Sequence, residues 1–446
     1  MGFNKVNNEL TQTNLYDRVK KLLVSYEWSD CCFAVSGKKI KAHKLILCIS
    51  SPVFEAMFYG PLSSDKEVVI TDIEPEIFQQ LLNYIYTDKV EISSIEEALE
   101  LLYASRKYIL DHLTDMCIAY IQTNICVDNV IQVLNYPDYD KQLTSCALKL
   151  FCEHARYLFR ENIDMISSSC MEIILKSDQM NMKEVELIKN VFKWTKHYCQ
   201  QNEIPETFEN RHEVLFKNGL FELLRFNLLS FEELEEITNN VNNILLPKDL
   251  NYIKKSLLLE CENNERRSLH KHKYLPRSPL KLQWYLCYRS PLRPVAPLNI
   301  DLTNYIKHSR IKANKSIFIN SLCIPARTPP NLAFYNDNVP KTYTELLSVS
   351  IVSVSDNKIL QSKKFTSTVK YDSSVEIELS EPCFIKKNMW YNIQFMWPQN
   401  QFQPHSYVVE VRDRISYGYK TLTIEFDDLS NGTPVGSFLE GLKFCF

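Results

Sequence analysis

Glycine is scarce in this sequence, with eight residues among 446. Long stretches without a chain breaker favour helices, and no glycine-rich loop that could cradle a phosphate occurs. The fourteen cysteines stand singly apart from Cys31 and Cys32, and no Cys-x-x-Cys pair is present. Because dense disulfide frameworks belong to short secreted chains, we expect reduced and mostly buried thiols in an intracellular protein.

The sequence also lacks a large net charge and a long apolar run, and its polar first residues lead us to expect no leader peptide. Its 51 lysines and arginines nearly balance 54 acidic residues, so the chain has no bulk attraction for nucleic acid or anionic lipid. No apolar run approaches the roughly 20 residues of a membrane span, and Val6 stands where a myristoylation signal needs serine or threonine. We therefore expect no membrane or nucleic-acid partner and a cytoplasmic location, with the nucleus left open.

No set of catalytic or metal-binding residues is evident in the sequence. Arg211-His212-Glu213 begins like a zinc-protease motif, but Phe216 stands where the second histidine belongs. His270-Lys271-His272 offers two imidazoles, whereas zinc needs three or four converging ligands. We predict that the chain is not an enzyme and that it holds no metal or other cofactor.

What the sequence does contain is enough apolar material for several cores, since 45% of residues are hydrophobic and 12% are aromatic. Residues 15–125 mix two periodicities. Cys32–Val35 followed by Gly37 predicts a strand and a turn, whereas Ser51 and Pro52 suit the N-cap and first turn of a helix. Phe78, Leu81, Leu82 and Ile85 have helical spacing, so this segment is predicted to be α/β.

Two further segments follow with different periodicities. Residues 127–260 have helical spacing throughout, as at Val185, Ile188 and Phe192, and short connections predict paired helical hairpins. Beyond residue 300 the period changes to two, as at Leu347, Val349 and Ile351, which alternate with polar residues. Several short alternating strands separated by turn residues predict a β-sandwich.

The segment 261–298 between them is rich in proline and carries only basic charges after Glu265. Eight of its residues are lysine or arginine: Arg266, Arg267, Lys271, Lys273, Arg277, Lys281, Arg289 and Arg293. Such a segment could bind nucleic acid or direct nuclear import, but these functions favour compact basic runs. Because the charges are dispersed, we expect a linker, with docking as a strand on the following sandwich as the simplest structural role.

Several motifs in order carry a resemblance to a known domain. Ser29–Phe33, Lys41–Leu47 and Ser50–Phe58 resemble the signature of the BTB (POZ) domain. With Glu74–Phe78, Tyr84–Asp88, Tyr103–Tyr108 and Ser430–Thr433, nearly the whole chain is similar to the BTB–BACK–PHR adaptors. One departure is Asn320-Ser321-Leu322-Cys323, which stands where glycines are expected after the first strand of a PHR module.

The resemblance implies a multidomain α+β protein. Its parts would be a flexible tail (1–10), an α/β BTB dimerisation domain (11–126), an all-α BACK domain of helical hairpins (127–260), the basic linker (261–298) and an all-β PHR-like sandwich (299–446). The function implied is that of a substrate-recruiting adaptor for a cullin-three ubiquitin ligase. The alternative is a ligase-independent BTB scaffold or transcriptional cofactor, although no zinc finger or other DNA-binding module is visible.

Carried over by position, the cullin-binding residues are expected to be Phe54, Met57, Phe58, Tyr59, Leu62 and Tyr86. The alternative is that Phe54, Met57 and Phe58 belong to the domain core, which is the favoured interpretation for Phe54. Tyr86 closes its helix and is expected at the surface with a solvated hydroxyl. Relatives often carry glutamate two positions after the apolar residue that corresponds to Leu62, but here Ser64 stands there and Asp65 comes one place later.

Two further surfaces are predicted. A helix before the first strand is expected to pack against its copy in a homodimer, through Leu15, Val19, Leu22 and Leu23. Loops of the C-terminal sandwich are expected to bind an unidentified target protein through Phe334, Tyr335, Phe402 and His405. The alternatives are that the helix covers its own domain and that these rings fill the ends of the sandwich.

Overall fold

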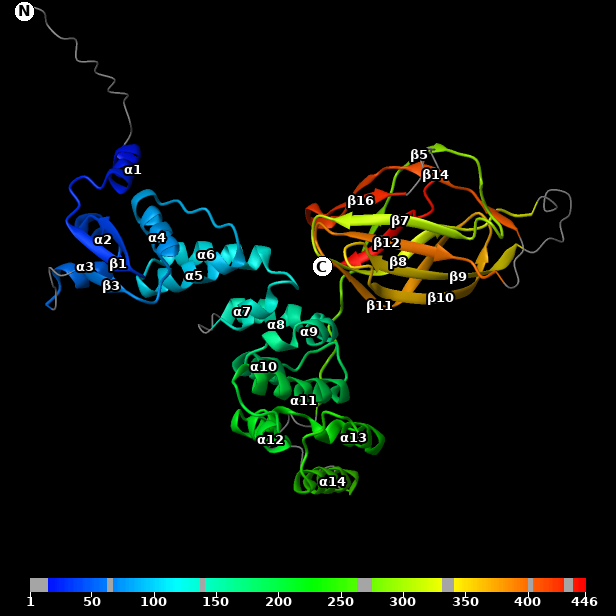
Figure 1. Cartoon of the computed structure of the whole chain (residues 1–446), viewed down its shortest axis with the longest axis horizontal. Helices are drawn as coiled ribbons and strands as arrows, with labels where there is room; N and C mark the ends of the chain where they lie inside the picture. Colours follow the sequence, from blue (N-terminus) through cyan, green and yellow to red (C-terminus); the bar gives the residue numbers. More distant parts are fainter. Residues whose placement is uncertain are drawn as a thin grey trace, which may run out of the picture. The chain divides into compact units, whose positions relative to one another are not determined.

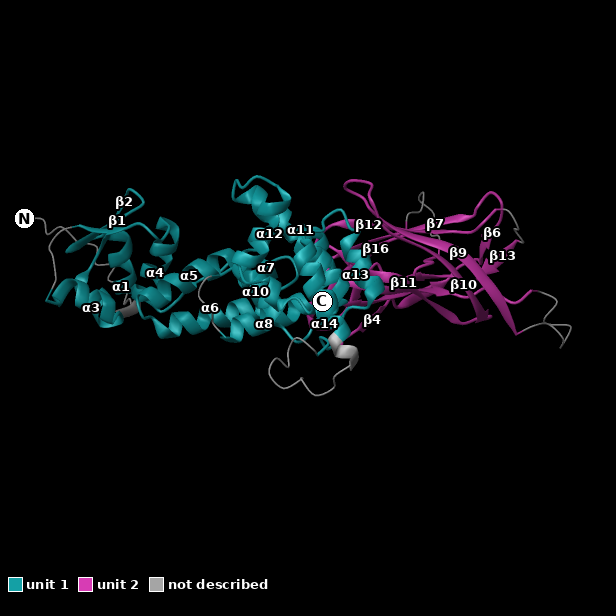
Figure 2. Ribbon diagram, turned by 90° about the horizontal axis from the view of Figure 1, so that it is seen from below, with its two compact units in different colours: residues 1–280 teal, residues 281–446 magenta. Residues whose placement is uncertain are grey.

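The structure is a computed structural model that describes residues 15–61, 67–136, 141–262, 275–330, 341–399, 404–428 and 436–446. Helices dominate the N-terminal part of the chain and strands the C-terminal part (Figure 1). The chain divides into two compact units, Met1–Leu280 and Lys281–Phe446 (Figure 2). Mixed α/β structure followed by helices and then antiparallel sheets confirms the predicted α+β class.

The first part of unit 1 surrounds a small sheet of order β2-β1-β3, in which β1 runs antiparallel to β2 and parallel to β3. Its elements are α1 (Leu15–Ser25), β1 (Cys31–Val35), β2 (Lys38–Ala42), α2 (Lys44–Ser50), α3 (Pro52–Tyr59), β3 (Val68–Ile70), α4 (Pro75–Thr87), α5 (Ile95–Lys107) and α6 (Asp111–Asn124). This arrangement confirms the α/β prediction for residues 15–125.

Aromatic packing holds this part together. The Phe33 ring on β1 lies 5.0 Å from that of Phe78 on α4, and Phe54 on α3 stacks on Tyr108 at 4.4 Å between centroids. Ser51 ends α2 and begins α3. Its hydroxyl accepts the Phe54 N–H and donates to the Tyr108 carbonyl at 2.6 Å. One side chain therefore caps α3 and also links it to the end of α5.

The second part of unit 1 is helical, as its periodicity predicted. Its helices are α7 (Val130–Leu134), α8 (Lys141–Glu153), α9 (Ala155–Glu161), α10 (Ser168–Lys176), α11 (Glu184–Gln201), α12 (Phe208–Lys217), α13 (Phe231–Thr238) and α14 (Pro247–Glu262). Ser167, Thr207 and Ser230 cap α10, α12 and α13 through their hydroxyls. Trp194 of α11 is buried and donates to the Ile166 carbonyl at 2.7 Å, which ties α11 to the start of α10.

Unit 2 consists of two main antiparallel sheets, of order β10-β9-β12-β7-β16-β15 and β11-β8-β17-β4, with two short ribbons, β13-β6 and β14-β5. Its strands are β4 (Tyr285–Tyr288), β5 (Pro291–Pro294), β6 (Leu298–Ile300), β7 (Ile306–Ala313), β8 (Ile317–Pro325), β9 (Thr342–Ser353), β10 (Ile359–Lys370), β11 (Ser374–Ile385), β12 (Trp390–Met396), β13 (His405–Tyr407), β14 (Glu410–Arg412), β15 (Ile415–Tyr417), β16 (Thr423–Asp427) and β17 (Gly441–Cys445).

The apolar residues that alternate with polar ones in the sequence are the residues that fill the core of unit 2. Ile351 on β9 is paired with Ile393 on β12, and both belong to one buried cluster with Ile319 and Leu442 of the second sheet. Two sheets that share one core in this way form a two-layer β structure. Asn320–Cys323, which stand where glycines were expected, lie in β8 as ordinary strand with no positive φ.

The described part of the segment predicted as a linker is folded, which corrects that prediction. Residues 275–280 lie on the helical part of unit 1, whereas β4 pairs with β17 as a strand of unit 2. Arg277 and Arg289 are buried because acidic partners, Glu184 and Asp428, reach them from far along the chain. The sequence of this segment contains only the arginine of each ion pair, because the acidic partner lies far away in the chain. The expectation that this segment docks as a strand on the sandwich agrees with β4, which pairs with β17.

Candidate functional site

The C-terminal end of α3 presents the only predicted cullin-binding side chains that the described residues leave accessible. Phe54 and Phe58 point into the aromatic core and are nearly inaccessible. Met57 is half-buried, and Tyr59 exposes 63% of its surface. Leu62 lies outside the described residues. Helical geometry explains this division, because Phe54 and Phe58 lie four residues apart on one face and Met57 and Tyr59 on others.

Tyr86 is not at the surface, which corrects the expectation of a solvated hydroxyl. It is 4% exposed, and its oxygen accepts the His43 N–H at 2.9 Å and lies 2.7 Å from His43 Nδ1. Burial is the main cause that raises the pKa of the Tyr86 hydroxyl. His43 Nε2 lies 2.7 Å from the Glu27 carbonyl, so this histidine links the loop before β1 with the start of α2 and with Tyr86.

The predicted dimer helix mostly covers its own domain. Leu23 is buried, Val19 and Leu22 are half-buried, and α1 packs against α4. Leu15 begins the helix, but its side chain is not among those that the structure describes. The amphipathic pattern could not separate intramolecular from intermolecular burial, because both need the same apolar face.

A more exposed apolar surface lies beside α2, and sequence reasoning missed it. We name the set of Trp28, Leu45 and Ile49, which are 82%, 67% and 77% exposed, the α2 patch. Asp30 accepts the Lys44 N–H at 2.7 Å, which holds the loop that contains Trp28 against the start of α2. Leu45 and Ile49 share one helix face because they lie four residues apart. That spacing was visible in the sequence and is the signal that could have found the patch.

Most of the predicted target-binding residues cannot be placed, since Phe334, Tyr335 and Phe402 lie outside the described residues. His405 begins β13 and is half-buried, with its ring 6.2 Å from Trp397 and 5.4 Å from Tyr407. For His405 the structure thus matches the alternative in which the ring fills an end of the sandwich. Beside it, the Thr328 N–H donates to the Ser406 carbonyl at 2.8 Å.

A buried carboxylate organises this end of unit 2. Glu345 is fully buried and accepts from Arg327 at 2.7 Å, from the Tyr343 hydroxyl at 3.0 Å and from the Tyr407 hydroxyl at 2.9 Å. Trp397 donates to Tyr407 at 3.0 Å, which extends the network. Burial and the Glu345 charge both raise the pKa of Tyr407, so its hydroxyl stays a donor. The network is a scaffold for the strand ends and holds no open position for a reactant.

The described side chains form no metal-binding cluster and no membrane-spanning helix. No group of three or more histidine, cysteine, aspartate or glutamate residues among them is placed to hold a metal. The zinc-protease-like motif is structural, because His212 Nε2 contacts Asp249 at 2.9 Å and its ring stacks on Phe216. None of the helices in the described ranges combines the length and apolar character that a membrane span requires.

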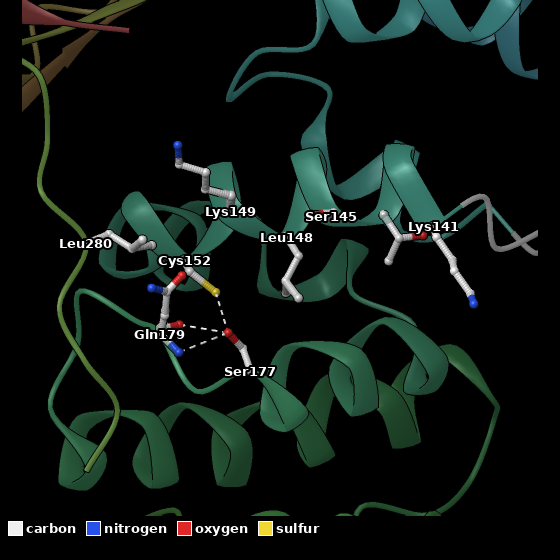
Figure 3. A pocket seen from close by; sticks show the side chains of 9 residues that line it. Lys141, Ser145, Leu148, Lys149, Cys152, Ser177, Gln179 and Leu280 are labelled. Carbon is white, nitrogen blue, oxygen red and sulfur yellow. Dashed lines mark hydrogen bonds between the residues drawn. The ribbon is translucent and has the colours of Figure 1, made fainter. Parts of the chain in front are cut away.

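The pocket in Figure 3 has a volume of about 420 Å³ and lies on the helical part of unit 1. Its wall includes Lys149, Cys152, Ser177, Gln179 and Leu280. The Cys152 thiol contacts the Ser177 hydroxyl at 3.6 Å, and burial raises the pKa of this thiol to about 11. A thiol that stays protonated near neutral pH is a poor nucleophile. The pocket lies where α8, the segment after α10 and the chain at Leu280 meet.

Comparison with known proteins places the first part of the chain in a defined class. Residues 19–125 match the model of the BTB/POZ domain. This fold is a protein-interaction domain, and its presence indicates an interaction adaptor. Proteins that carry it are typically non-enzymatic.

The chain is similar to BTB/POZ domain-containing protein 3 of Homo sapiens, with 31% identity over 184 residues, which cover 40% of this chain and 35% of that protein. It is also similar to BTB/POZ domain-containing protein 6 of Xenopus laevis, with 32% identity over 204 residues, 45% of this chain and 38% of that protein. The chain thus matches little more than a third of the length of these relatives. The BTB domain of zebrafish PATZ1 aligns over 28% of this chain and 100% of its own, with 21% identity and a TM-score of 0.23.

Proposed function

We propose that the chain is a substrate-recruiting adaptor of a cullin-three ubiquitin ligase. In this proposal the BTB domain binds the cullin, the helices from α7 to α14 act as a BACK-type spacer, and unit 2 acts as a PHR-like module that binds the target. The chain needs no catalytic residue for this task, because an adaptor works by raising the effective concentration of a target lysine near the conjugating enzyme. We expect it to act in the cytoplasm.

The observation that carries the proposal is the exposed Tyr59 at the end of α3 in a BTB domain. Tyr59 is 63% exposed beside half-buried Met57, so most of its side chain is available to a partner. Aromatic side chains that keep a polar tip are suited to anchor interfaces. We propose Met57 and Tyr59 as cullin contacts together with Leu62, whereas Phe54, Phe58 and Tyr86 are buried and belong to the interior of the domain.

The test is the affinity of the full chain for the cullin-three scaffold after Tyr59→Asp. A hot-spot loss on the order of 2 kcal/mol corresponds to roughly a thirtyfold weaker Kd. Tyr252→Asp is the matched control, since Tyr252 is also an exposed helical tyrosine but lies on α14. Unchanged affinity in Tyr59→Asp would remove the site. Absence of cullin binding in the wild type would remove the ligase function and favour the scaffold or transcriptional cofactor.

We also propose that the BTB domain forms a homodimer, with the α2 patch as part of its interface. Leu45 and Ile49 are exposed on one face of α2, and the loop that carries Trp28 is held at the start of the same helix, and a contiguous exposed apolar surface marks an interaction site. Leu45→Asp combined with Ile49→Asp should give a monomer by light scattering at micromolar concentration. Val69→Asp, at an exposed valine on β3, should leave the dimer intact. A monomeric wild type would contradict the proposal.

Target binding by unit 2 is testable by deletion. If unit 2 binds the target, a chain that lacks residues 281–446 should keep the cullin and lose its other specific partners. An unchanged set of partners would overturn the assignment.

A further inference from the structure

Residues Leu275–Leu280, which we name the strap, form an extended segment that lies on the helical part of unit 1. The Ser278 N–H donates to the Asp178 carbonyl at 2.8 Å, and the Met180 N–H donates back to the Ser278 carbonyl at 3.0 Å. The Leu280 N–H reaches the Asn181 side chain at 2.7 Å. The strap therefore pairs like a strand with the segment that follows α10.

Arg277 anchors the strap from within. Its guanidinium donates to the Leu175 carbonyl at 2.9 Å and to the Ser177 carbonyl at 3.3 Å, and it lies 3.5 Å from the Glu184 carboxylate. Arg225 also donates to the Leu275 carbonyl at 2.6 Å. Pro276 and Pro279 disfavour the α conformation in the residues that precede them, so the strap is extended whether it is docked or free.

Ser278 lies on the opposite face of the strap from Arg277. In extended chain successive side chains alternate, and here Arg277 is buried while Ser278 is exposed. Its hydroxyl donates to the Asp178 carbonyl at 3.3 Å. An exposed serine that precedes proline in extended chain has the form that proline-directed serine kinases accept. We propose that Ser278 is a phosphorylation site and that phosphate there releases the strap.

The charges around Ser278 determine whether a phosphate there weakens or strengthens the docking of the strap. A phosphoserine oxygen has no proton to donate to the Asp178 carbonyl, and it brings about two negative charges near the Asp178 carboxylate. That carboxylate already holds Arg225 at 2.6 Å, so Arg225 is not free to neutralise the phosphate. Lys149 lies on the same pocket wall as Leu280, but its side chain points away from Ser177 and Gln179 (Figure 3). Arg277 is buried on the opposite face of the strap and pairs with Glu184, so a phosphate in the docked state meets the Asp178 carboxylate and loses the serine hydroxyl hydrogen bond.

In the transfer step, the Ser278 hydroxyl oxygen attacks the γ-phosphorus of ATP. The bond from that phosphorus to the bridging oxygen of ADP breaks, and the hydroxyl proton leaves to the base of the kinase. Release would lengthen the undocked chain that leads to β4, because residues 275–280 are held on unit 1 while the strap is docked. The proposal thus concerns regulated reach and does not depend on which partner the BTB domain binds.

The test uses the full chain with ATP and a purified proline-directed kinase. Mass spectrometry should find phosphate on Ser278, and Ser278→Ala should abolish that phosphate. Amide hydrogen exchange should then be at least tenfold faster at Met180, Ser278 and Leu280 in the modified protein. Arg277→Gln is the positive control for release, since it should speed the same amides without phosphate while the amides of α11 stay protected.

Ser290→Ala is the matched negative control, because Ser290 is the other exposed serine before a proline among the described residues. This variant should behave as the wild type at the strap. If Ser278 takes no phosphate, the site is wrong. If Ser278 takes phosphate and exchange at Met180 is unchanged or slower, the release is wrong, and slower exchange would mean that Lys149 captures the phosphate.

Discussion

Buried polar side chains in this protein join segments that are distant in sequence. His43 and Tyr86 connect the start of α2 with the end of α4, and Arg289 connects β4 with Asp428 beyond β16. Each such group is desolvated, so a donor or acceptor that is left unsatisfied costs more free energy than the hydrogen bond itself contributes. The loss of one partner should therefore cost more than the loss of an exposed group of the same type.

Tyr86→Phe tests this at one atom. The variant keeps the ring but removes the oxygen that accepts the buried His43 N–H, so the BTB domain should lose about 1–3 kcal/mol of unfolding free energy. The midpoint of urea unfolding measures the loss. Tyr59→Phe removes an exposed hydroxyl and should change stability by less than about 0.5 kcal/mol. Equal effects in the two variants would contradict the structural role of Tyr86.

Two cysteines on α8 differ in exposure and so should differ in reactivity. Burial raises the pKa of the Cys152 thiol to about 11, whereas Cys146 is exposed on the same helix. Since only the thiolate reacts quickly, iodoacetamide at pH 8 should modify Cys146 well before Cys152 in the native protein. Raising the pH toward 11 should narrow the difference, because the thiolate fraction of Cys152 then increases. Mass spectrometry of timed samples measures both sites, and equal rates at pH 8 would contradict the burial of Cys152.

At the scale of elements, short polar signals set where helices begin. Ser51, Ser167, Thr207 and Ser230 each accept an N–H of the helix that they precede, which satisfies a donor that has no partner within the helix. These starts depend on neighbouring residues alone, so they are readable without a structure. Which helix face is covered by the same domain and which by a partner is not local, as α1 demonstrates.

Ser230→Ala should measure how much one helix N-cap contributes to the free energy of unfolding. Ser230 and Glu233 form a capping box on α13, in which each side chain accepts the backbone N–H of the other residue. The substitution should lower the unfolding free energy of unit 1 by about 1 kcal/mol. Ser230→Asp should restore most of the loss because aspartate also caps. The thermal midpoint is the measurement, and a loss in Ser230→Asp as large as in Ser230→Ala would contradict the capping role.

At the scale of the whole molecule, two compact units with separate cores should unfold as separate cooperative transitions. Glu345→Ala should destabilise only unit 2, by about 3–5 kcal/mol, because it leaves the Arg327 guanidinium partly buried without its counter-charge. Calorimetry of the full chain should show one transition lowered and the other unchanged. Glu378→Ala, at an exposed glutamate on β11, is the control and should move neither. A shift of both transitions in Glu345→Ala would contradict their independence.

The sequence by itself determined the order α/β, helical and then β, the BTB domain, and the cores of β9 and β12. These follow from periodicity, capping residues and a motif with several pieces in order, all of which are properties of neighbours in the chain. Only the tertiary structure decided that Tyr86 is buried, that Leu23 packs within its own domain, that Leu45 and Ile49 are exposed, and that residues 275–298 are folded. Each of these outcomes depends on which distant segment packs against the residue, as Glu184 and Asp428 pack against the two buried arginines. A pattern of neighbouring residues does not specify such a contact.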